Sequence, residues 1–322
     1  MTDQHRLLLV IEDQEAIEPM IRSRFPALET YVFRAEDRIE EVMERFAPTI
    51  AFVTVSDHMP KPDFVKILYT PAMQWFSNGA AGVEHLGQWD PQAVTVTNAS
   101  GVNARYLAQY TIAAHMSANI RMPDYAAQQR DKNWLVHPWV PFEGRRFCVA
   151  GLGKIGQEVA RLAKGLGMVT TGTRGTARPT DHVDEVYGAD DLTKALEGAD
   201  FVSVHAAHTP ETEGMFNADT FAAMKDGAIF VNAARGALVD ESALIDALDS
   251  GKIRTAILDV FQTEPLPEDS PLWTHPNVIV TPHMADTVTS WELNFARAFA
   301  DNLDQWLKGE PMTNIVDPAK GY

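Results

Sequence analysis

The stretch VAGLGKIGQEVARLAKGLG, residues 149–167, decides the fold, because an apolar strand, a glycine-rich turn and the start of a helix follow one another in it. Gly151 would allow the tight turn, and Gly153 would let the backbone approach a pyrophosphate. Gly156 would let the helix pack on the strand, so that the N-terminus of the helix faces the negative charge. GxGxxG alone is a weak signal, but in this setting it predicts a dinucleotide-binding Rossmann unit.

Short apolar or β-branched runs alternate with helical patterns on both sides of this stretch, which is typical of βαβ units. Five strand candidates end by residue 98, and six more begin with RFCVAG at residues 146–151. Between the two series, residues 100–120 are expected to form one long helix capped by Ser100. Residues 122–145, rich in aromatic residues and proline, are expected to form an extended connection. The pattern predicts an α/β protein with two doubly wound parallel sheets.

The composition excludes several classes of protein. With 322 residues, 45% of them hydrophobic, the chain is long enough for two domains with their own cores. A formal net charge of −17 without a basic run argues against nucleic acid as a partner. No stretch approaches the roughly 18 apolar residues of a membrane span, and the N-terminal run LLLVI is too short and wrongly flanked for a secretory signal. The single cysteine, Cys148, excludes an internal disulfide, fits a cytoplasmic location and is expected to be a buried thiol.

The residues after the next strand indicate which dinucleotide binds. An NAD site needs an Asp or Glu about 20 residues beyond the glycines, where it accepts hydrogen bonds from the ribose hydroxyls. Here the strand MVTTGT, residues 168–173, ends at Thr173 and is followed by Arg174. A guanidinium can bind a 2′-phosphate through two parallel hydrogen bonds, which favours NADP(H). The alternative is that Arg174 is a solvated surface residue and that NAD is accepted as well.

Three polar groups follow strands in the last third of the chain. Arg235 lies in VNAARGALVD, Glu264 in LDVFQTEPLP and His283 in VIVTPHMAD. Because the carboxyl ends of strands line the ligand crevice of a doubly wound sheet, these groups should converge. An arginine can hold a 2-oxo acid, a histidine can supply the proton that accompanies hydride transfer, and a glutamate can orient the histidine. Each also has a plain structural alternative, as a turn residue, a solvated acid or a core histidine, but their coincidence at three strand ends favours catalysis.

The motifs GLGKIG, VHAAHTPET, VNAARG, LDVFQTEPLP and TPH occur in this order, and with them nearly the whole chain resembles the D-2-hydroxyacid dehydrogenase family. The resemblance implies a catalytic triad of Arg235, Glu264 and His283, with His283 as the general acid of reduction. It also implies that Asp259 contacts the nicotinamide amide. The other cofactor-binding residues it implies are Gly151, Gly153, Lys154, Ile155, Gly156, Thr173, Arg174, Ala206, Ala207, Pro210, Thr212 and Ala233.

The family's fold implies a Rossmann cofactor domain, residues 100–284, inserted into a flavodoxin-like substrate domain of residues 1–99 and 285–322, with the active site in the cleft. Family members are typically homodimers joined through their cofactor domains. We expect that contact near Trp134 and Trp139, and Trp139 is the candidate to reach the partner's active site, with ordinary packing as the alternative. The loop SNGAAGVEHL matches the family's substrate loop, whose backbone would bind the substrate carboxylate around Asn78, Gly79, Ala80 and Ala81.

The chain departs from the family's pattern at three places. Ala207 stands where the family usually has proline, and Gln109 stands where it commonly has glutamate. The residues Met-Ala-Asp at 284–286 replace the small residues that usually follow the catalytic histidine. The change at Gln109 alters the predicted function little, whereas the change at residues 284–286 leaves the size of the substrate open.

The sequence thus predicts an NADPH-preferring reductase of small 2-oxo acids, with glyoxylate or hydroxypyruvate as the substrate and no metal site. A hydride would pass from the nicotinamide to the carbonyl carbon while His283 protonates the oxygen. Two alternatives stay open. One is a reductase of bulkier 2-oxo acids such as phenylpyruvate; the other is a non-enzymatic, NAD(P)-sensing binding protein, since one branch of the family contains transcriptional corepressors.

Overall fold

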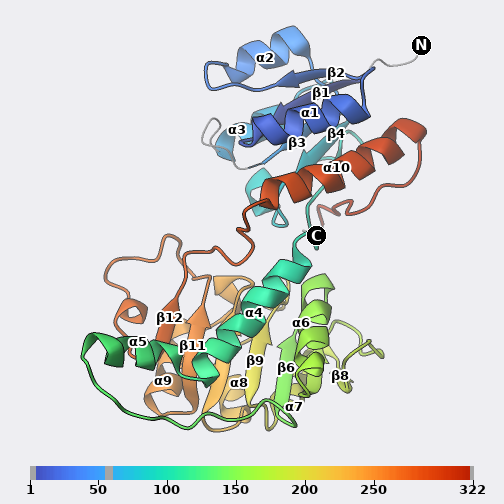
Figure 1. Cartoon of the computed structure of the whole chain (residues 1–322). Coiled ribbons are helices and arrows are strands. Elements are labelled where there is room, and N and C mark those ends of the chain that lie inside the picture. Colours follow the sequence, from blue (N-terminus) through green and yellow to red (C-terminus); the bar gives the residue numbers. More distant parts are fainter. Residues whose placement is uncertain (1–4, 55–60, 320–322) are drawn as a thin grey trace. The chain divides into compact units, whose positions relative to one another are not determined.

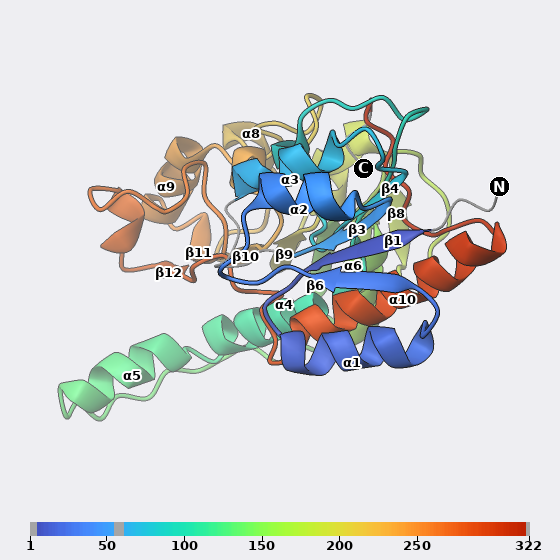
Figure 2. The same cartoon turned by 90° about the horizontal axis from the view of Figure 1, so that it is seen from above.

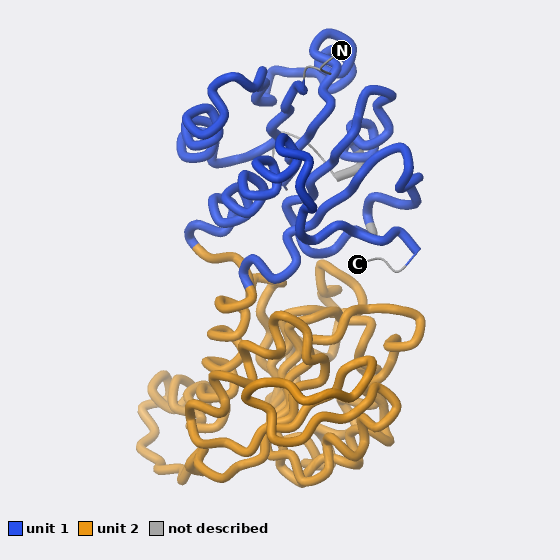
Figure 3. The backbone as a smooth tube through the Cα atoms, turned by 90° about the vertical axis from the view of Figure 1, so that its right-hand side faces the viewer, with its two compact units in different colours: residues 1–103, 289–322 blue, residues 104–288 orange. Residues whose placement is uncertain are grey.

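The computed structural model describes residues 5–54 and 61–319, apart from the side chains of residues 61, 62 and 84. Figure 1 and Figure 2 show its helices and strands from two directions. The chain forms two compact units, one of Met1–Asn103 with Thr289–Tyr322 and one of Ala104–Val288 (Figure 3). The expected domain boundaries, after residues 99 and 284, each precede the observed divisions by four residues.

The first unit is a parallel sheet with helices on both faces. Alternate residues of its first strand point to opposite faces: Leu7 and Leu9 pack with α1 (Gln14–Arg24) and α10 (Trp291–Lys308), and Leu8 packs with α2 (Ile39–Phe46) and α3 (Lys61–Leu68). A short helix, η1 (Glu84–Leu86), precedes the last strand. The five strands run in the flavodoxin-like order β2-β1-β3-β4-β5, as predicted, and are β1 (Arg6–Val10), β2 (Glu29–Val32), β3 (Ile50–Val53), β4 (Trp75–Asn78) and β5 (Thr95–Thr97).

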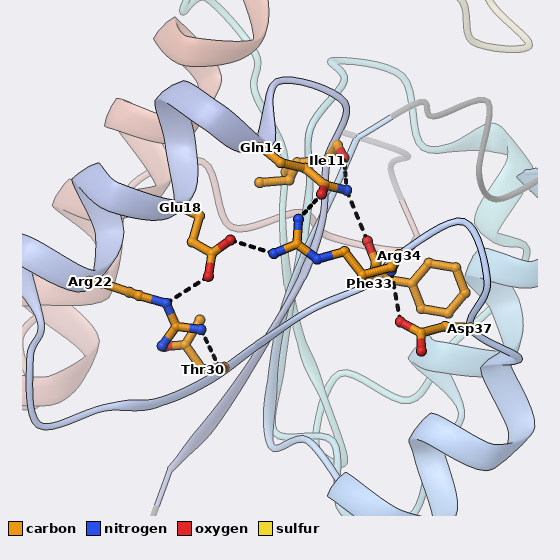
Figure 4. A network of polar contacts seen from close by, with 8 residues as sticks. All are labelled: Ile11, Gln14, Glu18, Arg22, Thr30, Phe33, Arg34 and Asp37. Atoms are coloured by element: carbon orange, nitrogen blue, oxygen red, sulfur yellow. Dashed lines mark hydrogen bonds and ion pairs between the residues drawn. The ribbon is translucent and has the colours of Figure 1, made fainter.

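A polar network joins α1 to the residues after β2 (Figure 4). Glu18 accepts hydrogen bonds from Arg22 at 2.8 Å and from Arg34 at 2.7 Å, and Arg34 also donates to the Gln14 side chain. The Gln14 amide in turn donates to the carbonyl of Phe33 at 3.0 Å. Burial raises the pKa of Glu18, but the hydrogen bonds from the two arginines outweigh it and leave that pKa lowered. The network fixes α1 beside the carboxyl end of β2.

The second unit is a larger parallel sheet, again covered on both faces. Helices α4 (Ala104–Asn119) and α6 (Lys154–Gly165) pack on one face. Helices α7 (Leu192–Leu196), α8 (Ala218–Ala223) and α9 (Glu241–Asp249) pack on the other (Figure 1). Short 3₁₀ helices lie at η2 (Ala189–Asp191), η3 (Gly236–Leu238) and η4 (Pro271–Trp273).

The strand order of this second sheet, β12-β11-β10-β9-β6-β7-β8, places the fingerprint strand β6 at the point where the order reverses, which is the cofactor crevice of a Rossmann fold. The predicted fold class, with two doubly wound parallel sheets, is confirmed. The seven strands are β6 (Arg146–Ala150), β7 (Val169–Thr173), β8 (Glu185–Tyr187), β9 (Phe201–Val204), β10 (Ala228–Asn232), β11 (Ile253–Leu258) and β12 (Val278–Val280).

The segment expected to be an extended connection contains a helix, α5 (Met122–Arg130), which projects from the second unit (Figure 2). Pro123 lies in its first turn, where the missing N–H has no intrahelical partner to lose. α5 buries none of its residues, so no apolar periodicity marks it in the sequence. The expectation of extended structure is therefore wrong at residues 122–130.

Two further boundaries differ from the expectations. The long helix begins at Ala104 and not at Ser100, whose amide donates to the Asn98 side chain at 3.1 Å within a turn. β8 carries no strand pattern in the sequence, because its three residues lie partly exposed at the edge of the sheet. Within the described ranges, no helix combines the length and the apolar character needed to cross a bilayer.

Candidate functional site

Three groups predicted to be catalytic follow neighbouring strands of the second unit. Arg235 comes after β10, Glu264 after β11 and His283 after β12, and these strands pair side by side. Their carboxyl ends therefore share one edge of the sheet. The structure brings Glu264 and His283 together, because Nδ1 of His283 lies 2.7 Å from Oε2 of Glu264. Since a carboxylate only accepts, Nδ1 carries the hydrogen, and Nε2 is the ring atom that can face a substrate.

The backbone of His283 is held in the left-handed region, with φ of 49°. A non-glycine residue adopts this conformation at some cost, and such residues cluster at functional sites. The amide of His283 donates to the carbonyl of Asp259 at 2.8 Å and to that of Thr281 at 3.1 Å. Its side chain is 48% exposed, so it is not a core histidine.

Arg235 is positioned by a close approach of two loops. Its neighbour Gly236 packs so tightly that an added Cβ would lie 1.9 Å from the carbonyl carbon of Phe261. Only glycine fits there, and this contact sets the Arg235 loop against the loop that leads to Glu264. The amide of Phe261 donates to Oε1 of Glu264 at 3.0 Å, which leaves Oε2 for His283.

Asp259 anchors the turn that carries His283. Its side chain is 1% exposed and accepts hydrogen bonds from the Thr281 hydroxyl at 2.5 Å, the Met284 amide at 3.0 Å and the Ala285 amide at 2.9 Å. No sequence pattern predicts this role, since the two amides become neighbours of Asp259 only through the fold. The contact of Asp259 with the nicotinamide amide stays a prediction.

Tyr110 extends the same chain of hydrogen bonds from α4. Its hydroxyl oxygen lies 2.6 Å from that of Thr281, which itself donates to Asp259. Burial raises the pKa of Tyr110 to about 12, so the phenol is neutral across the physiological range. No sequence signal points to Tyr110, because Thr281 lies 171 residues further along the chain.

Asp286 is a further acid in this cluster, in the Met-Ala-Asp segment that departs from the family pattern. Burial raises the pKa of Asp286, and the charges of His283 and Arg235 act in the opposite direction. Its electrostatic neighbours also include Asp259. The described residues contain no group of three or more His, Cys, Asp or Glu side chains arranged to hold a metal ion.

The glycine-rich turn forms a cradle between β6 and α6. Gly151 has φ of 107°, and a Cβ on it would lie 2.4 Å from the amide nitrogen of Ala206. Gly153 is the N-cap of α6 and offers no side chain to its first amides, which begin with Lys154 and Ile155. The N-terminus of a helix carries the positive end of its dipole, which suits a pyrophosphate, so these residues fit a dinucleotide.

The other residues predicted to bind the cofactor lie at the carboxyl ends of the adjacent strands. Ala206 and Ala207 follow β9, Ala233 follows β10, and Thr173 ends β7. The Thr212 hydroxyl donates to the carbonyl of Ala207 at 2.7 Å and closes the turn that contains Pro210. Gly156 lies in the first turn of α6 and is buried.

Arg174 lies directly after β7, where a site for NAD would carry an acid. Its Nη1 donates to the Thr180 hydroxyl at 3.0 Å, and its amide donates to the carbonyl of Tyr187 at 3.1 Å. Among the described residues, no carboxylate oxygen lies within 4.0 Å of its guanidinium. The local charge therefore suits a phosphate.

In the first unit, the predicted substrate loop turns its carbonyls toward the sheet. The Asn78 amide donates to the carbonyls of Ala80 at 3.1 Å and Gly82 at 2.8 Å, and the Asn98 amide donates to that of Ala81 at 2.8 Å. Because N–H and C=O point in opposite directions across a peptide plane, the amides that follow these carbonyls point away from the sheet. Asn78 is buried and acts as a brace, while Gly79 donates its amide to the carbonyl of Val53 at 2.7 Å.

The connection after α5 exposes large apolar side chains. Trp134 is 94% exposed, and Val136 and Leu135 are exposed as well. Trp139 is 51% exposed, with its ring centroid 6.3 Å from that of Phe142. Packing within the described chain therefore covers only half of Trp139.

Comparisons with known proteins agree with this geometry. Residues 112–285 match the family model described as D-isomer specific 2-hydroxyacid dehydrogenase, NAD binding domain. The chain is 36% identical to a glyoxylate reductase of Korarchaeum cryptofilum over 70% of each chain. It is 39% identical to chloroplastic D-3-phosphoglycerate dehydrogenase 2 of Arabidopsis thaliana over 74% of this chain and 39% of that protein. The chain thus spans about half or less of the length of the phosphoglycerate dehydrogenases it resembles.

Two solved structures extend the comparison over the whole chain. A D-isomer specific 2-hydroxyacid dehydrogenase of Xanthobacter autotrophicus in complex with NADPH and MES has 31% identity and a TM-score of 0.81, covering 99% of this chain and 100% of the other. An NADPH-dependent glyoxylate/hydroxypyruvate reductase of Sinorhizobium meliloti in complex with NADP and sulfate has 26% identity and a TM-score of 0.82 with the same coverage. The chain therefore belongs to the D-isomer specific 2-hydroxyacid dehydrogenase family.

Proposed function

We propose that this protein is an NADPH-preferring reductase that converts small 2-oxo acids, glyoxylate or hydroxypyruvate, into 2-hydroxy acids. The observation that carries the proposal is the 2.7 Å contact between His283 and Glu264. It lies at the carboxyl ends of neighbouring strands, where Arg235 also lies. Similar proteins support the choice of substrate, since they include a glyoxylate reductase and a glyoxylate/hydroxypyruvate reductase.

In the proposed reaction each of the three residues has a separate task. Arg235 pairs with the substrate carboxylate and polarises the adjacent carbonyl. Glu264 accepts the Nδ1 hydrogen of His283, which orients the ring. His283 then gives the proton on Nε2 to the carbonyl oxygen. The reduced nicotinamide, when bound, supplies the hydride.

The proposed preference for NADPH depends on Arg174. Its guanidinium would bind the 2′-phosphate, while the cradle of Gly151, Gly153 and Gly156 and the first turn of α6 would hold the pyrophosphate. Two similar structures contain NADPH or NADP, which supports this preference. NAD remains a second cofactor in the proposal, because Arg174 also has a protein partner in Thr180.

The proposed substrate loop acts through its backbone. Because Asn78 and Asn98 bind the carbonyls of residues 80–82, the amides of residues 81–83 can bind the second oxygen of the substrate carboxylate. The side chain of Asn78 already donates to carbonyls of the loop. Asn78, Ala80 and Ala81 would therefore contribute only main-chain atoms to the substrate site.

We further propose a homodimer in which the exposed arm, α5 with residues 131–140, is covered by a second copy. Exposed apolar surface of this extent, with Trp134, Val136 and Trp139 on one segment, is typical of an interface. Trp139 is the residue proposed to reach the partner's active site. A cytoplasmic location is proposed as well, since the one cysteine, Cys148, is a buried thiol.

The experiment that tests the function is oxidation of the reduced cofactor, followed by absorbance, with a panel of 2-oxo acids. Glyoxylate, hydroxypyruvate and phenylpyruvate are each offered with NADPH and with NADH. The proposal expects turnover of the two small acids and a higher kcat/KM with NADPH. Turnover of phenylpyruvate alone would favour the reductase of bulkier acids. Cofactor binding without any turnover would favour the non-enzymatic binding protein.

A further inference from the structure

The chain that follows α10 returns to the first sheet and pairs with the end of β5. Ile315 forms an antiparallel bridge with Thr97. The amide of Asn98 donates to the carbonyl of Asn314 at 3.1 Å. The returning chain therefore lies against the part of the first unit that braces the proposed substrate loop.

Asn314 holds the chain that leaves β5. Its side-chain amide donates to the carbonyl of Asn98 at 3.2 Å and to that of Ser100 at 2.9 Å. Its backbone has φ of 58°, a left-handed conformation that asparagine tolerates better than most residues. Asn302 on α10 fixes the preceding residue, because its side chain donates to the carbonyl of Thr313 and accepts its amide, both at 2.9 Å. Asn314 is thus tied to α10 and to the end of β5.

The residues that Asn314 holds bind the proposed substrate loop in turn. The side chain of Asn98 is buried and donates to the carbonyl of Ala81 at 2.8 Å. The amide of Ala99 donates to the carbonyl of Ala80 at 3.0 Å. Because a carbonyl shares its peptide plane with the amide of the next residue, each of these bonds also orients the amide that follows. Those amides belong to the group that is proposed to bind the substrate carboxylate.

A small cavity lies among the same asparagines. Its volume is about 20 Å³, and its lining includes Asn78, Asn98, Asn302 and Asn314. This is room for about one water molecule and too little for a 2-oxo acid. These asparagines therefore do not form a substrate pocket of their own, and their hydrogen bonds act on the loop.

We infer that Asn314 is a positioning residue, which fixes the proposed substrate loop in the form that binds the carboxylate of a 2-oxo acid. The inference rests on the proposed function, in which the amides of residues 81–83 bind that carboxylate. Asn314 acts through Asn98 and the chain that follows it, and not by contact with the substrate. Its loss should therefore weaken substrate binding without slowing the chemical step.

The test begins with Asn314→Gly, because glycine adopts the same left-handed backbone and only the side chain is lost. KM for glyoxylate should rise about five- to tenfold, the worth of about one hydrogen bond. The kcat and the dissociation constant of NADPH should stay within about twofold of the wild type. Asn314→Asp keeps the shape of the side chain but replaces its donor with an acceptor, and it should raise KM at least as much.

Gln14→Ala is the matched control. The side-chain amide of Gln14 also donates to two main-chain carbonyls of the first unit, those of Ile11 and Phe33. These residues follow β1 and β2, whereas the proposed substrate loop follows β4. This variant should lose stability as Asn314→Gly does, but it should keep the wild-type KM. An unchanged KM in Asn314→Gly, or an equal rise in both variants, would overturn the inference.

A double variant shows whether Asn314 acts through Asn98. Asn98→Ala removes the donor to the carbonyl of Ala81, so KM should rise in this variant as well. If the two residues act on the loop in series, the rise of KM in Asn314→Gly/Asn98→Ala should be well below the product of the two single effects. A rise equal to that product would contradict the inference.

Hydrogen exchange separates this inference from the proposed function. The amide of Ala99, which binds the loop carbonyl of Ala80, should exchange at least about fivefold faster in Asn314→Gly than in the wild type and in Gln14→Ala. Absence of turnover with every 2-oxo acid would sink the proposed function, and the exchange of this amide would still show whether Asn314 fixes the loop. Equal exchange in all three proteins would refute that role.

Discussion

At the scale of single residues, His283 combines a left-handed backbone, two main-chain hydrogen bonds and a carboxylate partner. A residue held this firmly has little freedom to turn its ring. In the proposed reaction, the ring would therefore deliver a proton from Nε2 in one direction. No other described side chain is paired with Glu264 in the same way.

Replacing His283 with Ala should lower kcat by at least about 100-fold, the usual contribution of a general acid. The dissociation constant of NADPH should stay within about twofold of the wild type, because the cradle lies at β6 and not at β12. Steady-state kinetics and cofactor fluorescence measure the two effects. His208→Ala, an exposed histidine, is the control. Unchanged turnover of His283→Ala would show that His283 is not the general acid.

Arg174→Asp should reverse the cofactor preference, since it exchanges a phosphate partner for a repelling charge. The ratio of kcat/KM with NADPH to that with NADH should fall by about 10- to 100-fold or more, the worth of hydrogen bonds to a charged group. Arg178→Asp makes the same charge change four residues along the chain and should have a smaller effect. If the two variants behave alike, general charge and not Arg174 decides the preference.

Two histidines whose ring nitrogens are buried should make the second unit sensitive to acid. The ring nitrogens of His115 and His205 have no hydrogen-bond partner among the described residues, and burial lowers the pKa of each to about 3. The unfolded chain binds protons at these residues near their ordinary value of 6.5, while the folded chain does not. Their contribution to stability is therefore complete above pH 6.5 and is lost as the pH falls toward 3.

His115→Leu should flatten the dependence of the melting temperature on pH below pH 6.5, the ordinary value for histidine. Calorimetry between neutral and mildly acidic pH measures the slope. His208→Gln, at an exposed position, should leave the slope as it is in the wild type. An equal slope in all three proteins would show that these imidazoles do not control acid unfolding.

At the scale of elements, the site depends on turns that a strand or helix pattern does not describe. The apolar runs predict most strands, and the glycine fingerprint predicts the start of α6, because both depend on neighbours in sequence. The Tyr110–Thr281–Asp259 chain joins α4, β12 and β11 and depends on the fold. Such contacts cannot be inferred from spacing along the chain.

Tyr110→Phe should lower kcat about three- to tenfold and the free energy of unfolding by about 1 kcal/mol, the net worth of one hydrogen bond. KM for the cofactor should not change, because the lost bond supports only the His283 turn. Tyr106→Phe on the same helix removes a hydroxyl that contacts Arg105 near the surface and is the matched control. A Tyr110 variant with lowered stability but normal kcat would have a structural role alone.

At the scale of the whole molecule, the two sheets and the three proposed catalytic residues were open to prediction, since glycines, a histidine and an arginine at strand ends carry local signals. The helix α5 was not, because its residues are exposed and show no apolar face. The exposed arm to which α5 belongs has a proposed role only in contact with a second copy of the chain.

Trp134→Ser should weaken the proposed homodimer, because it removes the most exposed large apolar side chain of the arm. Light scattering should give twice 35.6 kDa for the wild type and a lower average mass for the variant at low concentration. Trp273→Ser, a half-exposed tryptophan on η4, should leave the mass unchanged. A monomeric wild type would contradict the proposal, and Trp139→Ala with normal kinetics would return Trp139 to ordinary packing.

The chain's single cysteine has a practical consequence for spectroscopy. Cys148 is buried in β6, and burial raises its pKa to about 12, so its sulfur is neutral and shielded from solvent. Maleimide dyes react with accessible thiolates and should leave the natural protein unlabelled. One cysteine introduced at an exposed position such as Asp190 would then carry the only dye, without any need to remove Cys148 first.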